Sequence, residues 1–267
     1  MMLRNMRDSD GSPLENSFEA VDERTGEQIC AAALEVSENP KLYPNRPLRV
    51  RIRLEGRPTD EVFGAVLAQA RAVCRASGLP ARVYASCPAE DEALLRFFED
   101  FGFRDDDGQV RVRRALDNPR EVGKLPAGCV MVNDALEPIE ERRFFLDRYN
   151  ELFGTAHDLD WLEGFIQRDD FMRILAVAPK GLVNETVVWR EGNVGVIGYM
   201  QTSRRWRRMG VATEMLKYAA RYFTECGLRE MTGVVHVRIP GLLRTFERAG
   251  FYQDKLLLRY PGIDLQL

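Results

Sequence analysis

The chain contains an internal repeat, and this repeat constrains its fold more than any other feature. The segments ALLRFFEDFGF (93–103) and GLLRTFERAGF (241–251) share Leu, Leu, Arg, Phe, Glu, Gly and Phe at matching places. Upstream of each lies an amphipathic helix pattern that ends in Gly-Leu, at Gly78 and at Gly227. Apolar residues in these patterns recur at spacings of three and four, and glycine readily ends a helix in the left-handed conformation. The repeat therefore predicts a duplicated unit.

The same order of elements surrounds both copies of the repeat. A strand pattern follows each long helix, at 81–86 and 230–237, and an alternating run closes each half, at 109–115 and 255–260. Each half ends helix, strand, helix, strand, which favours duplication over a chance match. We predict an α/β (α+β) fold of two related domains, whose mixed, mostly antiparallel sheets are flanked by helices.

A stretch rich in proline, glycine and charge, DNPREVGKLPAG (117–128), separates the halves and is typical of a linker. We therefore expect one domain over 1–120 and a second over 126–267. The second half is the more complete one, because it opens with a strand pattern and two amphipathic helix patterns. The first half lacks these two opening helices.

Composition excludes several classes of protein. The 267 residues carry a net charge of −3 with a pI of about 5.7, so the chain lacks the overall basic field typical of nucleic-acid binders. Five scattered cysteines without a pairing pattern indicate reduced thiols and a cytoplasmic location. No apolar run is long enough to span a membrane, so we expect no membrane partner. Two histidines and no cysteine cluster offer too few ligands for a metal site.

The second half carries a known signature after the strand pattern VGVIGYMQT (194–202). The residues RRMGVA (207–212) fit (Gln or Arg)-x-x-Gly-x-(Gly or Ala), between that strand and an amphipathic helix, and ERAGF (247–251) follows downstream. This arrangement resembles the Gcn5-related N-acetyltransferase (GNAT) superfamily over Val130 to about Leu257. The first half resembles it more weakly, as a degenerate second copy. The resemblance implies an acyl-CoA, such as acetyl-CoA, as co-substrate.

The spacing of this motif has a physical reason. A helix that begins at Arg208 or Met209 leaves its first N–H groups unpaired, and these donors suit the pyrophosphate of coenzyme A. Gly210 allows close approach of the backbone, Ala212 is small, and Arg207 can add a charge-assisted hydrogen bond. The resemblance also implies that backbone groups of Met200, Gln201 and Thr202 contact the pantetheine arm. The predicted cofactor-binding residues are Met200, Gln201, Thr202, Arg207, Arg208, Met209, Gly210, Val211, Ala212 and Thr213.

The first half departs from the motif where it matters most. When the two helices are aligned by their Gly-Leu ends, PTDEVF (58–63) lies opposite the motif. Glu61 then replaces the glycine, and Asp60 adds a second negative charge that would repel a pyrophosphate. We therefore expect the first half to bind no coenzyme A.

The catalytic groups are less evident. Many GNAT members place a tyrosine, which protonates the leaving thiolate, where this chain has Phe246. Another group or water then takes that role, or the thiolate leaves unassisted, or the protein binds coenzyme A without turnover. Candidates for the general base are Glu185, Tyr199 and His236. A strand carboxylate usually faces water, which favours a solvent-facing Glu185, and a core or edge role is more usual for a histidine such as His236.

These features predict an N-acyltransferase that moves an acetyl group from acetyl-CoA to a primary amine of a small molecule or peptide, by direct attack in a ternary complex. One alternative is a coenzyme A-binding regulatory or structural protein without turnover. A second alternative is a nucleic-acid binder that uses Arg204–Arg208, although we expect no nucleic acid as partner. The acceptor itself is not encoded in any recognisable motif.

Overall fold

The computed structural model forms two compact units, each with its own hydrophobic core. Unit 1 comprises Met1–Gly108, Leu152–Gly154 and Leu258–Leu267, and unit 2 comprises Gln109–Glu151 and Thr155–Leu257. The residues that the structure describes are 1–7, 12–117, 121–239 and 241–266. The predicted α/β class is confirmed, because both units combine a mixed sheet with flanking helices.

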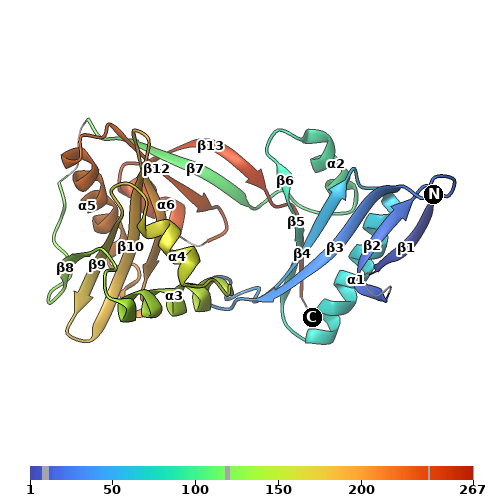
Figure 1. Ribbon diagram of the computed structural model, residues 1–267, viewed down its shortest axis with the longest axis horizontal. Coiled ribbons are helices and arrows are strands. Elements are labelled where there is room, and N and C mark those ends of the chain that lie inside the picture. Colours follow the sequence, from blue (N-terminus) through green and yellow to red (C-terminus); the bar gives the residue numbers. More distant parts are fainter. Residues whose placement is uncertain (8–11, 118–120, 240, 267) are drawn as a thin grey trace. The chain divides into compact units, whose positions relative to one another are not determined.

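Unit 1 is built on a six-stranded sheet with the long helix α1 (Asp60–Ser77) against one face (Figure 1). A second, shorter helix is α2 (Glu92–Asp100). In sheet order the strands are β1 (Met2–Arg7), β2 (Pro13–Val21), β3 (Gln28–Glu38), β4 (Leu48–Gly56), β5 (Ala81–Ala85) and β14 (Gly262–Leu265). Among the described residues no helix precedes α1, which agrees with the predicted lack of two opening helices.

Unit 2 contains most of an eight-stranded sheet. In sheet order the strands are β6 (Cys87–Pro88), β13 (Tyr252–Arg259), β7 (Gly108–Ala115), β12 (Glu230–His236), β11 (Val194–Thr202), β10 (Gly181–Glu191), β9 (Met172–Ala178) and β8 (Val130–Asp134). The helices are α3 (Ile139–Phe153), α4 (Leu159–Ile166), α5 (Val211–Glu225), α6 (Leu242–Arg248) and the short 3-10 helix η1 (Arg204–Trp206). The strand β6 pairs with the last residues of β13, within unit 1.

The two faces of the unit 2 sheet have different cover. Apolar residues such as Ile174 and Val188 form a core with α5 and α6 on one face. On the other face, residues of α3 and α4 pack over β10 and β11 (Figure 1). Because side chains alternate along a strand, neighbours of the core residues, such as Arg173 and Val187, lie on the α3 and α4 face.

The structure contains the repeat that the sequence predicts. In each unit a strand, a long helix and a second strand form a parallel crossover, β4–α1–β5 and β11–α5–β12. Gly78 and Gly227 end the two long helices with φ angles of 67° and 81°, in the left-handed region that glycine tolerates. The short helices α2 and α6 follow at the repeated sequence segments.

The strands that close the two halves are exchanged. β7, the last strand of the first half of the chain, pairs antiparallel with β12 in unit 2. β14, at the end of the chain, pairs antiparallel with β5 in unit 1. The division into domains over 1–120 and 126–267 stays a prediction; the compact units each take strands from both halves of the chain.

Candidate active site

The parallel strands β11 and β12 separate part-way along their length. In the described part of the chain their pairing ends with Ile197 opposite Gly233. From there β12 continues along β7, while β11 continues along β10 to Thr202. The edge of β11 beyond Ile197 that faces β12 therefore has backbone groups without strand partners. The residues predicted to contact pantetheine lie in this stretch: Met200, Gln201 and Thr202.

A β-bulge lies directly at this separation. The pairing of β11 with β10 shifts register between Val187 and Val188, which leaves Gly198 as an extra residue in β11. A bulge bends its strand and strengthens the local twist, so β11 turns where its pairing with β12 ends. The indole of Trp189 packs onto Gly198, because a Cβ at that position would lie 1.6 Å from Cζ3 of Trp189. Only glycine fits there.

The loop after β11 ends in a helix start without a side-chain cap. Arg208 and Gly210 have φ angles of 66° and 81°, and α5 begins at Val211. The expected start at Arg208 or Met209 is therefore wrong, because two left-handed residues interrupt the helical conformation. The first backbone bond of the helix joins Glu214 N–H to the Gly210 carbonyl at 3.2 Å. The N–H groups that precede it are those predicted to meet the pyrophosphate: Val211, Ala212 and Thr213.

Four arginines surround this helix start, and all are exposed: Arg204, Arg205, Arg207 and Arg208. Arg205 donates to the Lys180 carbonyl at 2.8 Å, and Arg207 donates from Nε to the Thr202 carbonyl at 3.2 Å. Within the described ranges none of the four pairs with a carboxylate. Trp206 instead packs against the core of unit 2. The loop thus offers cationic groups to an anionic ligand.

The side chains of the predicted pantetheine-facing residues already have partners. Met200 packs against the core beneath α5. Gln201 accepts a hydrogen bond from the Tyr199 hydroxyl at 2.6 Å, and Thr202 Oγ1 accepts one from Asn184 Nδ2 at 2.7 Å. The polar side chains of Gln201 and Thr202 are therefore engaged within the chain, and the carbonyl of Thr202 already accepts from Arg207.

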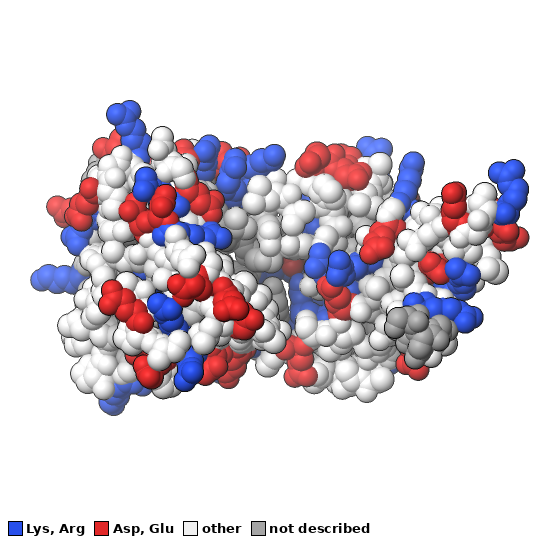
Figure 2. Space-filling view, viewed as in Figure 1, with Lys and Arg blue, Asp and Glu red and all other residues white. Residues whose placement is uncertain are grey.

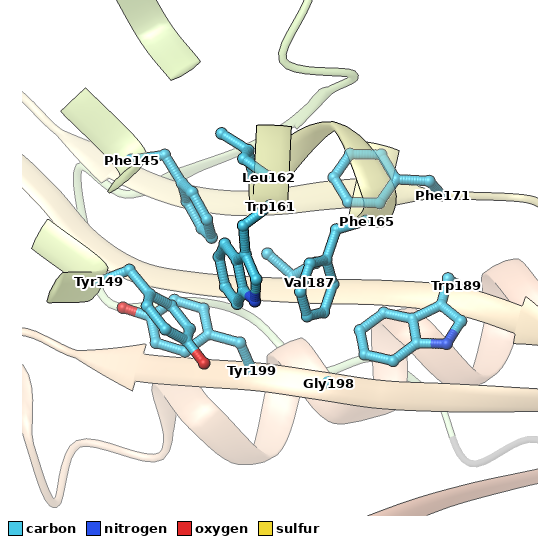
Figure 3. Close-up of a pocket in the computed structure, with 10 residues that line it drawn as sticks. All are labelled: Phe145, Tyr149, Trp161, Leu162, Phe165, Phe171, Val187, Trp189, Gly198 and Tyr199. Carbon is cyan, nitrogen blue, oxygen red and sulfur yellow. The ribbon is translucent and has the colours of Figure 1, made fainter. Parts of the chain in front are cut away.

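An aromatic recess lies on the other face of the sheet, between α3, α4, β10 and β11 (Figure 3). Its lining residues are Phe145, Tyr149, Trp161, Leu162, Phe165, Phe171, Val187, Trp189, Gly198 and Tyr199. The rings pack at centroid distances such as 4.9 Å between Tyr149 and Trp161 and 4.5 Å between Trp161 and Phe165. Because Gly198 and Tyr199 also belong to β11, the recess adjoins the point where β11 and β12 separate.

Glu185 lies on the same face and is fully buried, with 0% of its surface exposed. The expectation that this carboxylate faces solvent is wrong. Its Oε1 accepts hydrogen bonds from Arg173 Nε at 2.6 Å and from Arg148 Nη2 at 2.8 Å. Its Oε2 is buried and has no partner in the described part of the chain. A buried carboxylate oxygen without a partner is costly, so a proton donor beside it would stabilise the folded chain.

The two arginines beside Glu185 were missed by the sequence reasoning. Arg173 begins the otherwise apolar segment RILAVAP (173–179), and a lone charge beside such a strand was the available signal. Its Nη1 also contacts Asp134 at 2.5 Å and Glu141 at 3.1 Å, which satisfies a side chain that is almost fully buried. Arg148 reaches Glu185 from α3 and is about one-third exposed, so it lies between this carboxylate and solvent.

The other two candidate bases lie in different settings. Tyr199 is buried, and this burial raises its pKa well above the ordinary value, so its phenol stays protonated near neutral pH. It can donate a hydrogen bond there but cannot act as a base. His236 ends β12, and its Nε2 lies 3.0 Å from Nε2 of Gln109 on β7. The amide of Gln109 donates to this ring nitrogen, which leaves the proton of a neutral ring on Nδ1.

Phe246, which replaces the tyrosine of many GNAT members, lies close to the separation of the strands. Its ring is buried and packs on Phe251 at a centroid distance of 5.0 Å. A Cβ built on Gly233 would lie 3.2 Å from its Cε1 and 3.4 Å from the Cβ of Ile197. The ring therefore lies close to Gly233, the last residue of β12 that pairs with β11, but it has no proton to donate.

In the residues that the structure describes, no group of three or more His, Cys, Asp or Glu side chains is arranged to hold a metal ion. Within the same ranges, no helix is long and apolar enough to cross a membrane. All five cysteines are free thiols.

Comparison with known proteins identifies the family of this site. The model of the acetyltransferase (GNAT) family matches residues 129–251. This segment is therefore a GNAT domain, and the resemblance predicted from its motifs is confirmed. The match covers the separated strands, the arginine-rich loop, α5 and Phe246.

Solved structures extend the similarity of fold to the whole chain. A GCN5-related N-acetyltransferase from Sphaerobacter thermophilus is 20% identical over 95% of this chain and 82% of that one, with a TM-score of 0.54. A conserved protein of unknown function from Enterococcus faecalis, described as a probable N-acyltransferase, is 10% identical over 91% of this chain and 61% of that one, with a TM-score of 0.55. No curated protein matches the chain in sequence. Most of the chain therefore shares its fold with these two solved structures.

Proposed function

We propose that this protein transfers an acetyl group from acetyl-CoA, or the acyl group of a related thioester, to a primary amine of a small molecule or peptide. The observation that carries the proposal is the coincidence of an open edge of β11 with the uncapped start of α5. Backbone groups of Met200–Thr202 suit the amides of the pantetheine arm, and those of Met209–Thr213 suit the pyrophosphate. Exposed Arg207 and Arg208 add positive charge at the same end.

The acceptor amine reaches the thioester from the α3 and α4 face. Glu185 Oε2 is the buried acceptor without a partner on that face, so it suits the N–H of an incoming ammonium group. The carboxylate takes one proton, and the neutral amine attacks the thioester carbonyl carbon. A C–N bond forms, the nitrogen gives up its second proton to water, the C–S bond breaks, and coenzyme A departs as a thiolate. Arg148 and Arg173 fix the position of Glu185 for this role.

The departing thiolate has no proton donor at the position of Phe246. Tyr199 keeps its proton but already donates it in a hydrogen bond to Gln201. We therefore propose that neither Phe246 nor Tyr199 protonates the departing thiolate and that water does so. Because a coenzyme A thiol is a moderate acid, loss of the donor slows the reaction without preventing it.

Release of free thiol tests this function most simply. The purified chain is incubated with acetyl-CoA and a panel of primary amines, which includes amino acids, polyamines, aminosugars and short peptides. Thiol release above the rate of spontaneous hydrolysis, with a matching N-acetylated product by mass spectrometry, is the expected result. Tight binding of acetyl-CoA without thiol release for any amine would instead support a regulatory or structural coenzyme A-binding protein, the alternative that Phe246 favours.

A competition experiment tests the alternative of a nucleic-acid binder that uses Arg204–Arg208. Figure 2 shows basic and acidic side chains interspersed on the face that it displays, rather than a continuous basic surface. We propose that these arginines bind the phosphates of coenzyme A, so coenzyme A displaces labelled acetyl-CoA and duplex DNA or RNA at physiological salt does not.

Free thiols at all five cysteines support a cytoplasmic location.

A further inference from the structure

A row of arginines lies on the face of the unit 1 sheet opposite α1. Alternate residues of β4 are buried against α1, so Arg49, Arg51 and Arg53 lie on the other face. In the parallel register with β5, Arg82 and Tyr84 share that face. In unit 2, α3 and α4 lie on the sheet face opposite α5, whereas among the described residues of the first half no helix precedes α1.

Arg49 is a buried cation with too few partners. Only 5% of its surface is exposed, and its guanidinium lies between the rings of Tyr43 and Tyr84, at 4.1 Å and 4.4 Å from their centroids. Its one ion pair within the described ranges is with Asp107, at 3.6 Å, which is longer than a hydrogen bond. Its Nε is buried without any partner. A buried N–H group without an acceptor costs free energy of folding, and a bound acceptor would remove this cost.

In the neighbouring Arg82 both terminal nitrogens have acceptors, although its Nε, like that of Arg49, has no partner among the described residues. One terminal nitrogen donates to Asp106 at 2.6 Å and to the Tyr260 carbonyl at 3.1 Å. The other donates to Asp264 at 3.1 Å. The chain therefore supplies acceptors to both terminal nitrogens of Arg82 and leaves Arg49, directly opposite in the register, without a single hydrogen bond among the described residues.

The groups around Arg49 are mostly donors. Arg51 donates to Ser86 at 2.8 Å and lies 3.5 Å from Glu35, at the limit of hydrogen bonding. Burial raises the pKa of Tyr43 and of Tyr260, so their hydroxyls stay protonated near neutral pH. An anion in this place would meet guanidinium and phenol groups, with Asp107 as the one buried carboxylate close by.

We propose that Arg49, with Arg51, Tyr43 and Tyr84, binds a small oxyanion: the carboxylate or phosphate group of a ligand. The rings of Tyr43 and Tyr84 hold the guanidinium in place, and two parallel N–H···O bonds from the edge of a guanidinium are the geometry that carboxylates and phosphates accept. This site belongs to unit 1 and does not depend on acyl transfer by unit 2.

Titration of the full-length chain with oxyanions tests the site. The ¹⁵N resonances of arginine Nε groups are followed while inorganic phosphate or acetate replaces chloride at constant ionic strength, so that general screening is unchanged. We expect a saturable shift of the Arg49 Nε signal. Saturation with phosphate alone identifies a phosphate site, and saturation with acetate alone or with both identifies a carboxylate-accepting site. A shift that rises linearly and equally for all three anions would overturn the proposal.

Two variants assign the effect to the right residue. Arg51→Met, which leaves the stacked Arg49 in place, is expected to weaken binding about 10-fold or more, since it removes one charged donor. Arg53→Met is the matched control, because Arg53 is on the same strand and face but is well exposed and paired with Glu35 at 3.0 Å. We expect it to bind as the unaltered chain does. Equal weakening in both variants would show general electrostatic attraction and contradict a built site.

Discussion

Helix α1 of unit 1 and helix α5 of unit 2 occupy the same place in the repeat but begin in opposite ways. The hydroxyl of Thr59 caps α1 by accepting from Val62 N–H at 3.4 Å, and Asp60 and Glu61 follow in the first turn. α5 follows a left-handed Gly210 without a side-chain cap. The start of α1 carries a side-chain cap and two acidic residues beside its first N–H groups. The first N–H groups of α5 have no side-chain cap and suit an anion.

The first turns of the two helices also differ in the size of the side chain at one aligned position. In α1, Phe63 is completely buried and packs on a cluster of four other phenylalanines: Phe97, Phe98, Phe101 and Phe103. The aligned residue of α5 is the small Ala212. At the start of α1 an aromatic cluster and a side-chain cap are present. At the start of α5 there is a small residue and no side-chain cap.

The largest effect is expected when α5 receives the charges of α1. The double substitution Met209→Asp with Gly210→Glu should weaken acetyl-CoA binding by about 100-fold or more, because two carboxylates then face the pyrophosphate. Isothermal titration calorimetry measures the dissociation constant. Gly210→Ala is the control for backbone strain at φ 81° and should lose much less affinity. An unchanged dissociation constant in the double variant would place the pyrophosphate elsewhere.

A comparably large effect on turnover is expected from Glu185→Gln. Loss of the base should lower kcat/KM by about 100-fold while the dissociation constant of acetyl-CoA stays the same. The buried Arg173 and the partly exposed Arg148 lose a charge partner, so circular dichroism must first show a native fold. Glu185→Asp, which keeps the charge, should retain more activity than the amide. Full activity in Glu185→Gln would remove this residue from the mechanism.

A smaller effect is expected at the β-bulge. Gly198→Ala forces the Trp189 ring to move and should cost about 1–3 kcal/mol of unfolding free energy, measured by urea denaturation. Gly164→Ala in α4 is the matched control, since a Cβ there meets nothing within 4 Å, and it should be neutral or slightly stabilising. Similar stabilities for the two variants would show that the contact between Trp189 and Gly198 is not restrictive.

The smallest effect is expected from restoring a hydroxyl. Phe246→Tyr should raise kcat by up to about 10-fold, because a phenol can then protonate the thiolate. The same change in the silent copy, Phe98→Tyr, should leave kcat unchanged and lower stability, since it buries a hydroxyl in an aromatic cluster. If both variants match the unaltered kcat, proton donation does not limit turnover.

Much of the fold could be predicted because its signals are local. Apolar spacing and the glycines at 78 and 227 indicate the two long helices, and the motif at 207–212 indicates the family. β1 was not predicted, because Met2–Arg7 has little of the alternation that marks a strand. The pairing of β7 with β12 and of β14 with β5 was not predicted either, since alternation marks a strand but does not say which sheet it joins.

The candidate site could be predicted on its cofactor side only. There the donors are consecutive residues at a helix start, so a short motif describes them. The environment of Glu185 depends on Arg148 and Arg173, which come from a helix and a strand elsewhere in the sequence. The general preference of charged strand residues for water therefore gave the wrong orientation, because only tertiary pairing makes burial of this carboxylate possible.

The stoichiometry of acetyl-CoA binding tests the central claim most directly. Calorimetric titration of the full-length chain should give one site per chain, competed by coenzyme A and abolished by the double substitution Met209→Asp with Gly210→Glu. Two sites per chain, or one site that survives this substitution, would show that the capped copy in unit 1 binds the cofactor and would contradict the account.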